Sequence, residues 1–306
     1  MKPRDAPDGS QKVIMSAPSA QLAPVPRSSQ RLSIAILVTL HLLCLLVFVL
    51  PVSARVVGLC AAGYVVRMWA ITAGYHRYFS HRAFKTSRAF QFLLGLLGTS
   101  ALQNGPIWWA SWHRHHHRYA DQPRDLHSPT MRGVWHAHMG WVLSSEPDHP
   151  DTSNVEDLTR FPELRYLDKH KWQPMIAYAV GCYAFAGVAG LVWGFVLSSI
   201  LVLHATALIN SLGHLRGSRR YATTDTSRNN LALALLTLGE GWHNNHHHAQ
   251  SSARQGFMWW EIDITYYTLK LLSWAGVIWA MRAPSERALL SSRVPAAALR
   301  PIPEQG

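Results

Sequence analysis

The stretch from Pro174 to Gly213 constrains the fold most, because its 40 residues include no Asp, Glu, Lys or Arg. At 1.5 Å per residue, a helix of that length would measure about 60 Å, roughly twice the hydrocarbon thickness of a bilayer. The run therefore predicts two membrane spans, at 174–192 and 195–213, divided by a turn near Gly190 to Gly194.

Two earlier segments have the same apolar character. Residues 32–50 form a run of 19 without a formal charge, and residues 56–75 are interrupted only by Arg67. About 20 apolar residues cross a bilayer. Because an arginine in lipid is costly, we expect the C-terminal end of the second segment to leave the bilayer for water. The sequence thus predicts an all-α membrane protein with four transmembrane helices in two hairpins.

Basic residues mark one side of these predicted spans. They gather before the first and third spans and after the second and fourth, which is the pattern of a cytoplasmic side. The residues concerned are Lys2, Arg4, Lys12, Arg27, Arg31, Arg77, Arg82, Lys85, Arg88, Lys169, Lys171, Arg216, Arg219 and Arg220. Both termini are therefore predicted to be cytoplasmic, together with a helical cap formed by 76–172 and 214–282.

The charge balance narrows the choice of partners. The chain carries 29 Lys and Arg against 17 Asp and Glu, a formal net charge of +12. The basic residues are spread without a nucleic-acid-binding motif, so they predict attraction to an anionic leaflet or substrate and no nucleic-acid partner. Cys44, Cys60 and Cys182 lie in apolar runs without a CxxC, which argues against disulfides, iron–sulfur clusters and thiolate zinc sites.

Both ends of the chain differ in composition from the domain between them, residues 31–282. Residues 1–30 are rich in Pro and Ser and predict a disordered tail, and residues 283–306, with four prolines, predict a loose one. Within the domain, residues 262–280 are apolar and aromatic but contain Asp263 and Lys270. We therefore expect an amphipathic helix in the membrane interface there, rather than a fifth span.

Histidine clusters are the second unusual feature, because the 18 histidines outnumber the 17 carboxylates. An HxxxxH begins at His76, and an HxxHH begins at His113 and again at His243. On a helix, positions i, i+3 and i+4 share a face, so each HxxHH would aim three imidazoles at one point, while His115 and His248 would face elsewhere. The candidate ligands are His76, His81, His113, His116, His117, His243, His246 and His247.

A single HxxHH is more often incidental, whereas three clusters on the predicted cytoplasmic side indicate metal binding. Eight neutral imidazoles exceed what one metal ion accepts, so they predict a dinuclear site for iron, copper, zinc or nickel. Asn210 and His214, spaced i and i+4 where the uncharged run ends, are further candidates. His204, in the middle of the fourth span, is expected to form an interhelical hydrogen bond.

Three carboxylates lie near the clusters, Asp121, Asp125 and Glu240. They would orient imidazoles by accepting a ring N–H, and a surface position is the alternative for the two aspartates. Zinc hydrolysis would require a carboxylate base and an open pocket, which so few carboxylates argue against. Redox-active iron beside a lipid-embedded cavity instead predicts O₂ chemistry on an acyl chain. With no GxGxxG, iron–sulfur cysteine set or HPGG motif, the electrons would come from a separate donor.

Four segments carry a resemblance to a known family. Gly74–Arg82 reads GYHRYFSHR, Trp112–His117 reads WHRHHH, Gly239–His247 reads GEGWHNNHH, and Asn210–His214 reads NSLGH. In this combination, residues 32–280 resemble the membrane fatty-acid desaturases, in particular the acyl-CoA Δ9 (stearoyl-CoA) branch of bacterial type.

The resemblance implies a mushroom-shaped fold whose cytoplasmic cap holds two Fe²⁺ ions. It implies nine ligands and a water-mediated contact from Asn210: one metal on His76, His81, His117, His247 and that water, the other on His113, His116, His214, His243 and His246. It also implies O₂ as co-substrate and a ferredoxin or reductase as electron donor. The substrate would be a saturated fatty acyl-CoA, or an acyl chain on another carrier, and the product would carry a cis double bond at Δ9.

Substrate contacts follow less directly. Trp108, Trp109 and Trp112 would wall an acyl tunnel, or alternatively anchor the protein at the membrane interface. Arg77, Lys85 and Arg88 would meet CoA phosphates, or alternatively belong to a solvated basic belt. Two other functions remain open at this point. One is a membrane di-iron hydroxylase or alkane monooxygenase, and the other is a metal transporter with histidine-rich segments.

Overall fold

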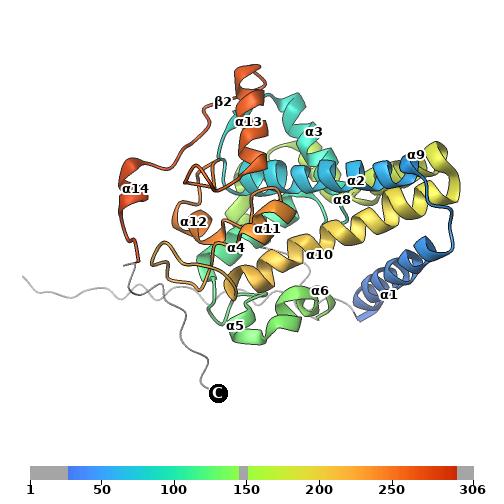
Figure 1. Ribbon diagram of the computed structural model, residues 1–306, viewed down its shortest axis with the longest axis horizontal. Coiled ribbons are helices and arrows are strands. Elements are labelled where there is room, and N and C mark those ends of the chain that lie inside the picture. Colours follow the sequence, from blue (N-terminus) through green and yellow to red (C-terminus); the bar gives the residue numbers. More distant parts are fainter. Residues whose placement is uncertain (1–26, 145–150, 295–306) are drawn as a thin grey trace, which may run out of the picture.

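A computed structural model describes residues 27–144 and 151–294, which are mostly helical (Figure 1). Two helices are long and apolar enough to cross a membrane, Ala54–Ser80 and Trp172–His214, and a shorter apolar helix covers Ile34–Phe48. In Figure 1, α1 (Arg27–Cys44) and α9 (Trp172–Gly190) lie at the right, α2 (Ala54–Trp69) and α10 (Ser198–Ser211) run from there toward the centre, and α12 (His243–His248) lies at the left.

The first two apolar segments are both helical. α1 (Arg27–Cys44) continues into the 3₁₀ turn η1 (Leu45–Phe48), and α2 (Ala54–Trp69) continues into the π-helix η2 (Ala70–Ser80). The predicted tail extended to residue 30, but α1 already begins at Arg27, directly after the last proline of the N-terminal region, since proline is tolerated only at a helix start. Residues 1–26 lie outside the described part of the chain.

The second pair consists of α9 (Trp172–Gly190), η5 (Leu191–Leu197), α10 (Ser198–Ser211) and η6 (Leu212–His214). The chain reverses at Ala186 and Gly187, not near Gly190 to Gly194 as predicted. Gly187 adopts φ +59°, a conformation that glycine reaches without strain. A Cβ on Gly190 would lie 2.3 Å from Cys182 O, so that glycine serves close packing and not the turn.

Arg67 departs from the expectation that its end of α2 is wet. The side chain is 1% exposed, and its guanidinium donates to Ser198 Oγ, to Ser199 Oγ over 2.6 Å and to Gly63 O over 3.0 Å. The ring of Tyr178 lies 4.5 Å from its Cζ. Hydroxyl oxygens of α10 and a carbonyl oxygen of α2 itself therefore replace water around this charge, as a buried arginine requires.

The remaining elements assemble around the ends of these helices. They are β1 (Lys85–Thr86), α3 (Arg88–Thr99), α4 (Pro106–Tyr119), α5 (Pro129–Arg132), η3 (His136–Gly140), α6 (Trp141–Leu143), η4 (Thr152–Val155), α7 (Glu156–Thr159), α8 (Pro162–Lys169), α11 (Leu231–Leu236), α12 (His243–His248), α13 (Ile264–Trp274), β2 (Ile278–Trp279) and α14 (Glu286–Leu290).

β1, β2 and α13 bear on the predicted all-α fold and on the predicted number of membrane spans. β1 and β2 pair antiparallel, Lys85 opposite Trp279, so a two-residue ladder accompanies the helices. α13 has 11 residues, a length of about 16 Å that is too short to cross a bilayer. The segment 262–280 therefore does not form a fifth span within the described structure.

The C-terminal segment is not loose up to residue 294. Ala222 N donates to Ser292 O and Val294 N to Arg220 O, both over 2.8 Å. A ring nitrogen of His248 lies 2.7 Å from Ala288 O. These bonds satisfy the backbone of a segment whose prolines suggested a loose tail. The rest of the predicted tail, 295–306, lies outside the described residues.

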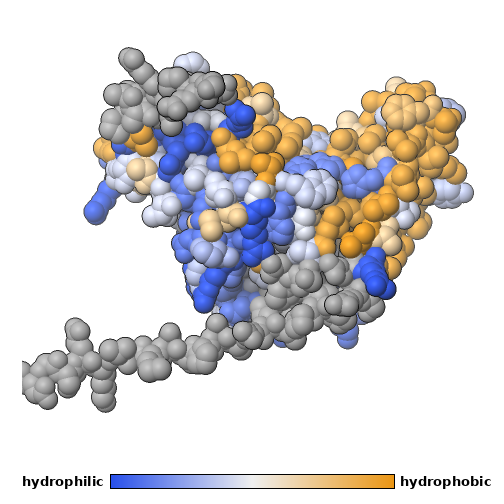
Figure 2. All heavy atoms as spheres, turned by 90° about the horizontal axis from the view of Figure 1, so that it is seen from below, coloured by the Kyte–Doolittle hydropathy of each residue, from blue (hydrophilic) through white to orange (hydrophobic). Residues whose placement is uncertain are grey.

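Surface polarity divides the molecule in the same way as the ribbon. Figure 2 shows hydrophobic side chains gathered at the right, over the ends of the long helices, and hydrophilic ones at the left. The exposed apolar residues of this surface include Leu42, Leu45, Phe48, Ile176, Val180, Phe185 and Val188. A continuous apolar surface of this kind suits lipid and not water.

Candidate metal centre

η2 positions the first two histidines. It is a wide helical segment in which hydrogen bonds close over five residues, and His81 N donates to His76 O over 3.2 Å. Residues five apart consequently share a face, and the ring centroids of His76 and His81 lie 4.9 Å apart. The HxxxxH spacing thus matches a π-helix, where an α-helix would turn the two rings apart.

α4 carries the second cluster and is held at its start by Asp168. The Asp168 carboxylate accepts from Ile107 N and from Trp108 N, each over 2.9 Å. Burial raises the pKa of Asp168 to about 6. Because these bonds satisfy two N–H groups of the first helical turn, they fix the orientation of the helix that presents His113, His116 and His117.

The nine predicted imidazoles converge in two groups. The five-histidine group comprises His76, His81, His113, His117 and His246, and the four-histidine group comprises His116, His214, His243 and His247. Within each group the ligand atoms all lie within 4.8 Å of one another. The groups adjoin, since the ring centroids of His117 and His247 are 4.4 Å apart.

The distances in the five-histidine group suit metal coordination. Its Nε2 atoms form a chain, with His76–His246 and His246–His117 at 2.9 Å, His117–His113 at 3.0 Å and His113–His81 at 2.8 Å. Ligands that lie about 2.1 Å from a metal at right angles are about 3.0 Å apart. His214 and His243 approach similarly in the other group, with Nε2 atoms 3.1 Å apart.

The division into groups differs from the one implied by the family resemblance. His113 and His246 lie in the group of His76, and His247 lies in the group of His116. The resemblance instead implied that His247 would share a metal with His76, and that His113 and His246 would share one with His116. An HxxHH also does not aim all three rings at one point. At 100° per residue, positions i+3 and i+4 lie on opposite sides of position i, so α4 gives His116 to one group and His117 to the other. His115 faces away, 3.0 Å from Arg124 O.

Four carboxylates stand behind the imidazoles. His116 Nδ1 lies 3.1 Å from Asp125, His214 Nδ1 3.1 Å from Asp121 and His247 Nδ1 2.8 Å from Asp225. His76 Nδ1 contacts Glu240. A carboxylate accepts the proton of Nδ1 and leaves the Nε2 lone pair for a metal.

The surface alternative for the two aspartates is wrong, since the side chains of Asp125 and Asp121 are 0% and 7% exposed. Asp225 was missed by the sequence analysis. It lies in the irregular segment between η6 and α11, where no periodic spacing links it to His247.

Protonation states in the cluster also suit a metal. Burial, reinforced by the neighbouring rings, holds the pKa of each of these imidazoles well below its ordinary value: His81, His113, His117, His243 and His246. They are therefore neutral at pH 7, as ligands must be. Hydrogen bonds from imidazole and hydroxyl groups outweigh burial for the carboxyls of Asp121 and Asp225, and the neighbouring His116 does so for Asp125, so the pKa values of all three carboxyls are lowered.

The donor set fits two divalent ions. Nε2 of His247 is buried without a hydrogen-bond partner although its Nδ1 contacts Asp225, and a metal would satisfy that lone pair. The four carboxylates supply four negative charges, which balance the four positive charges of two divalent ions. Buried charges require such balance.

Arg77 does not take the predicted substrate-binding position. Arg77 is fully buried. Its guanidinium pairs with Glu240 Oε1 over 3.1 Å and with Asp263 Oδ1 over 2.9 Å. It therefore supports the carboxylate behind His76. Lys85 is exposed in β1, and Arg88 pairs with Glu163 over 2.7 Å at the surface, so neither lines the cavities around the histidines.

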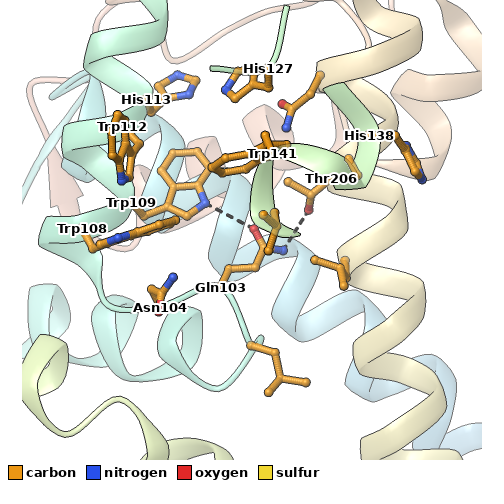
Figure 3. A pocket seen from close by; sticks show the side chains of 15 residues that line it. Gln103, Asn104, Trp108, Trp109, Trp112, His113, His127, His138, Trp141 and Thr206 are labelled. Atoms are coloured by element: carbon orange, nitrogen blue, oxygen red, sulfur yellow. Dashed lines mark hydrogen bonds between the residues drawn. The ribbon is translucent and has the colours of Figure 1, made fainter. Parts of the chain in front are cut away.

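An aromatic cavity leads to the histidine groups. Trp108, Trp109, Trp112 and Trp141 line it together with His113 (Figure 3). A second, smaller cavity shares some of this lining and extends to the two histidine groups. The lining of this second cavity includes Trp109, His113, His116, Thr206, Asn210 and His243.

A hydrogen-bonded bridge crosses the wall of the aromatic cavity. Trp109 Nε1 donates to Gln103 Oε1 over 3.2 Å, and Gln103 Nε2 donates to Thr206 Oγ1 over 3.0 Å (Figure 3). The bridge joins α4 to α10 and fixes the indole beside the histidines. Sequence patterns gave no signal for Gln103 or Thr206.

A separate chain of three imidazoles runs between the long helices. His204 Nε2 lies 2.9 Å from His41 Nε2, and His204 Nδ1 lies 3.0 Å from His138 Nε2. The expected interhelical hydrogen bond of His204 is confirmed. These rings connect α1, α10 and η3 and belong to neither histidine group.

Fold and site together define a helical protein with two adjoining histidine groups, suited to hold metal ions, beside an aromatic cavity. The family model for fatty acid desaturases matches residues 51–270. The chain is 38% identical over 258 residues to palmitoyl-monogalactosyldiacylglycerol delta-7 desaturase of Arabidopsis thaliana, covering 83% of this chain and 69% of that protein. It is 38% identical over 251 residues to acyl-CoA C20 Delta5-desaturase of Anemone leveillei, covering 81% and 80%. It is 39% identical over 250 residues to Delta-9 acyl-lipid desaturase 1 of A. thaliana, covering 80% and 81%.

This chain therefore belongs to the fatty acid desaturase family. Members of that family are oxidoreductases.

Proposed function

We propose that this protein is an O₂-dependent desaturase that uses two iron ions to place a cis double bond at Δ9 of a saturated acyl chain. The convergence of nine imidazoles into two groups beside an aromatic cavity carries the proposal. Family membership supports it independently.

The two histidine groups would each hold one iron ion, and Asn210, which lines both cavities, would act through a bound water. Iron supplies the activation of O₂ that removal of hydrogen from an unactivated chain requires. In the balanced reaction, the chain loses two hydrogens, O₂ takes up these with two electrons and two protons, and two waters form. A separate protein such as a ferredoxin or a reductase would supply the electrons.

The protein's own residues keep the site ready for this chemistry. Asp121, Asp125, Asp225 and Glu240 hold protons on Nδ1, so the opposite ring nitrogens stay available as ligands. The bridge from Trp109 to Gln103 and Thr206 holds the wall against which an acyl chain would bend. The tryptophan lining excludes water from the reacting carbons.

The membrane arrangement is part of the proposal. Two apolar pairs, α1 with α2 and α9 with α10, would give four spans, with the histidine groups at the ends of α2 and α10. Positive residues at those ends support a cytoplasmic site with both termini on the same side. Acyl-CoA is the proposed substrate, and relatives are named for acyl-CoA and for lipid substrates, and for positions 5, 7 and 9.

Expression in a desaturase-deficient host, followed by fatty-acid analysis, tests the proposal. We expect a monounsaturated acid two mass units lighter than its precursor, with the position read from fragmentation of a derivative. His116→Ala should abolish it, whereas His115→Ala, on the same helix but outside both groups, should not. A product that gains one oxygen would instead indicate a hydroxylase, and an active His116→Ala protein would contradict the proposed site.

A further inference from the structure

A third pocket, which we call the basic pocket, adjoins the aromatic cavity on the side away from the histidines. It has a volume of about 450 Å³, within the range of small-molecule sites. Its lining includes three cations, Arg165, Lys169 and Lys171, and one acidic residue, Asp168. Nothing in the proposed reaction at the metal centre uses these cations.

The basic pocket and the aromatic cavity share two lining residues, Asn104 and Trp108 (Figure 3). Asn104 adopts φ +62°, an uncommon conformation for a residue other than glycine. Its backbone oxygen accepts from Tyr75 Oη over 2.8 Å, and its Oδ1 accepts from Lys171 Nζ. A residue held on both sides in this way forms a fixed boundary between the two spaces.

The charges of the basic pocket are open to an anion. Arg165 donates to Thr159 O over 2.9 Å and Lys171 donates to Asn104 Oδ1, so within the described residues neither is neutralised by direct contact with a carboxylate. Arg165 and Lys169 are exposed. The oxygens of Asp168 are occupied by Ile107 N and Trp108 N. The lining thus keeps a positive excess with free donors, the chemistry that binds phosphate.

The pocket also lies where a membrane surface would be. Lys171 directly precedes Trp172, the first residue of α9, and the Trp172 side chain is 46% exposed. Tryptophan and lysine next to an apolar helix mark the headgroup level of a bilayer. An acyl chain that entered the aromatic cavity past Asn104 and Trp108 would therefore leave its headgroup beside these cations.

We propose that the basic pocket binds a phosphate group on the carrier of the acyl substrate, while the acyl chain passes between Asn104 and Trp108 toward the histidines. The inference rests on the proposed desaturase function and adds how the substrate is anchored. A phospholipid and acyl-CoA both carry such a phosphate, whereas a galactolipid does not.

The test compares the parent with the double variant Arg165→Gln, Lys169→Gln, as full-length protein in membranes with its electron donor. Arg287→Gln, an exposed arginine on α14 outside the pocket, is the matched control. KM and kcat are measured for acyl-phosphatidylglycerol, acyl-CoA and acyl-monogalactosyldiacylglycerol. Because hydrogen bonds to charged groups contribute enough for about a tenfold change in affinity, KM for the phosphate-bearing carrier should rise about tenfold in the double variant. The kcat, the galactolipid KM and the control should not change.

The carrier whose KM rises identifies the source of the phosphate. An equal change for all three carriers, or no change for any, would overturn the inference while leaving the desaturase function intact. A parent that forms no unsaturated product would instead refute the proposed function. Binding of spin-labelled phosphatidylglycerol and of spin-labelled acyl-CoA, each compared with a spin-labelled galactolipid and read by electron paramagnetic resonance, decides the inference without turnover. Equal binding of both phosphate-bearing carriers by parent and double variant would contradict it.

Discussion

The two histidine groups differ in what lies behind their rings. In the four-histidine group, His116, His214 and His247 each contact an aspartate. In the five-histidine group, Glu240 contacts His76, while Nδ1 of His117 and of His246 is buried without a partner. A carboxylate that accepts the ring proton makes the imidazole a more basic, and therefore stronger, metal ligand. One group therefore offers more ligands and the other offers stronger ones, so two metal ions would occupy unequal environments.

The largest expected effect comes from removing one ligand in each group. His246→Ala and His243→Ala should each abolish desaturation, well beyond the roughly 10–100-fold loss that follows removal of an outer partner. Bound iron, measured by plasma mass spectrometry, should fall from about two ions per chain toward one. His115→Ala is the control, because its ring lies outside both groups. Retention of both ions in either variant would break the assignment of groups.

A smaller effect is expected from the carboxylates, and it sharpens the asymmetry. Asp225→Asn keeps the shape of the side chain but weakens the acceptor for His247. We expect activity to fall about 10–100-fold and one ion to be lost faster to a chelator. Glu240→Gln should produce the corresponding loss from the five-histidine group. Equal release of both ions in both variants would show that the groups are not independent.

Acidification should destabilise the metal-free protein. Burial lowers the pKa of His127 to about 3 and that of His247 to about 4, against about 6.5 in an unfolded chain. Between these values the unfolded state binds more protons than the folded state, so stability falls as the pH drops below about 6.5. Thermal melting in detergent with a chelator should occur at lower temperature at pH 5 than at pH 7.5. A higher melting temperature at pH 5 would contradict this prediction.

The smallest effect is expected at the start of α4, which supplies both groups. Asp168→Ala removes the acceptor for Ile107 N and Trp108 N, a loss of about 0.5–2 kcal/mol in the free energy of unfolding. Both ions should be retained equally, since the helix carries ligands to both groups. Denaturant unfolding and iron content measure the two quantities, with Asp168→Asn, which keeps one acceptor, as the milder comparison.

Local periodicity explains what the sequence could predict. The three histidine clusters and His214 were found because their histidines recur at short, fixed spacings along the chain. Which ring joins which histidine group was not predictable, because that depends on how α4 and α12 face each other across the site. Asp225 carried no signal, since only the path of an irregular segment brings it to His247.

Charge patterns were less informative than spacing. Arg77 belongs to a run of basic residues that suggested a solvated belt or a phosphate contact, yet tertiary packing pairs it with Glu240 and Asp263. Arg67 was expected in water, yet serines on α10 surround it. A sequence shows that a charge is present but not which buried oxygens will meet it.

The π-helical segment η2 has a consequence for how this fold tolerates change in length. Since its wider turns accommodate one more residue than an α-helix would over the same rise, the chain here already contains the equivalent of an insertion. Losing a single residue between His76 and His81 would restore ordinary helical winding and leave the two rings four residues apart, still on one face, whereas adding a residue would turn the two rings apart. The pairing of these two rings therefore tolerates the loss of a residue at this point better than the gain of one.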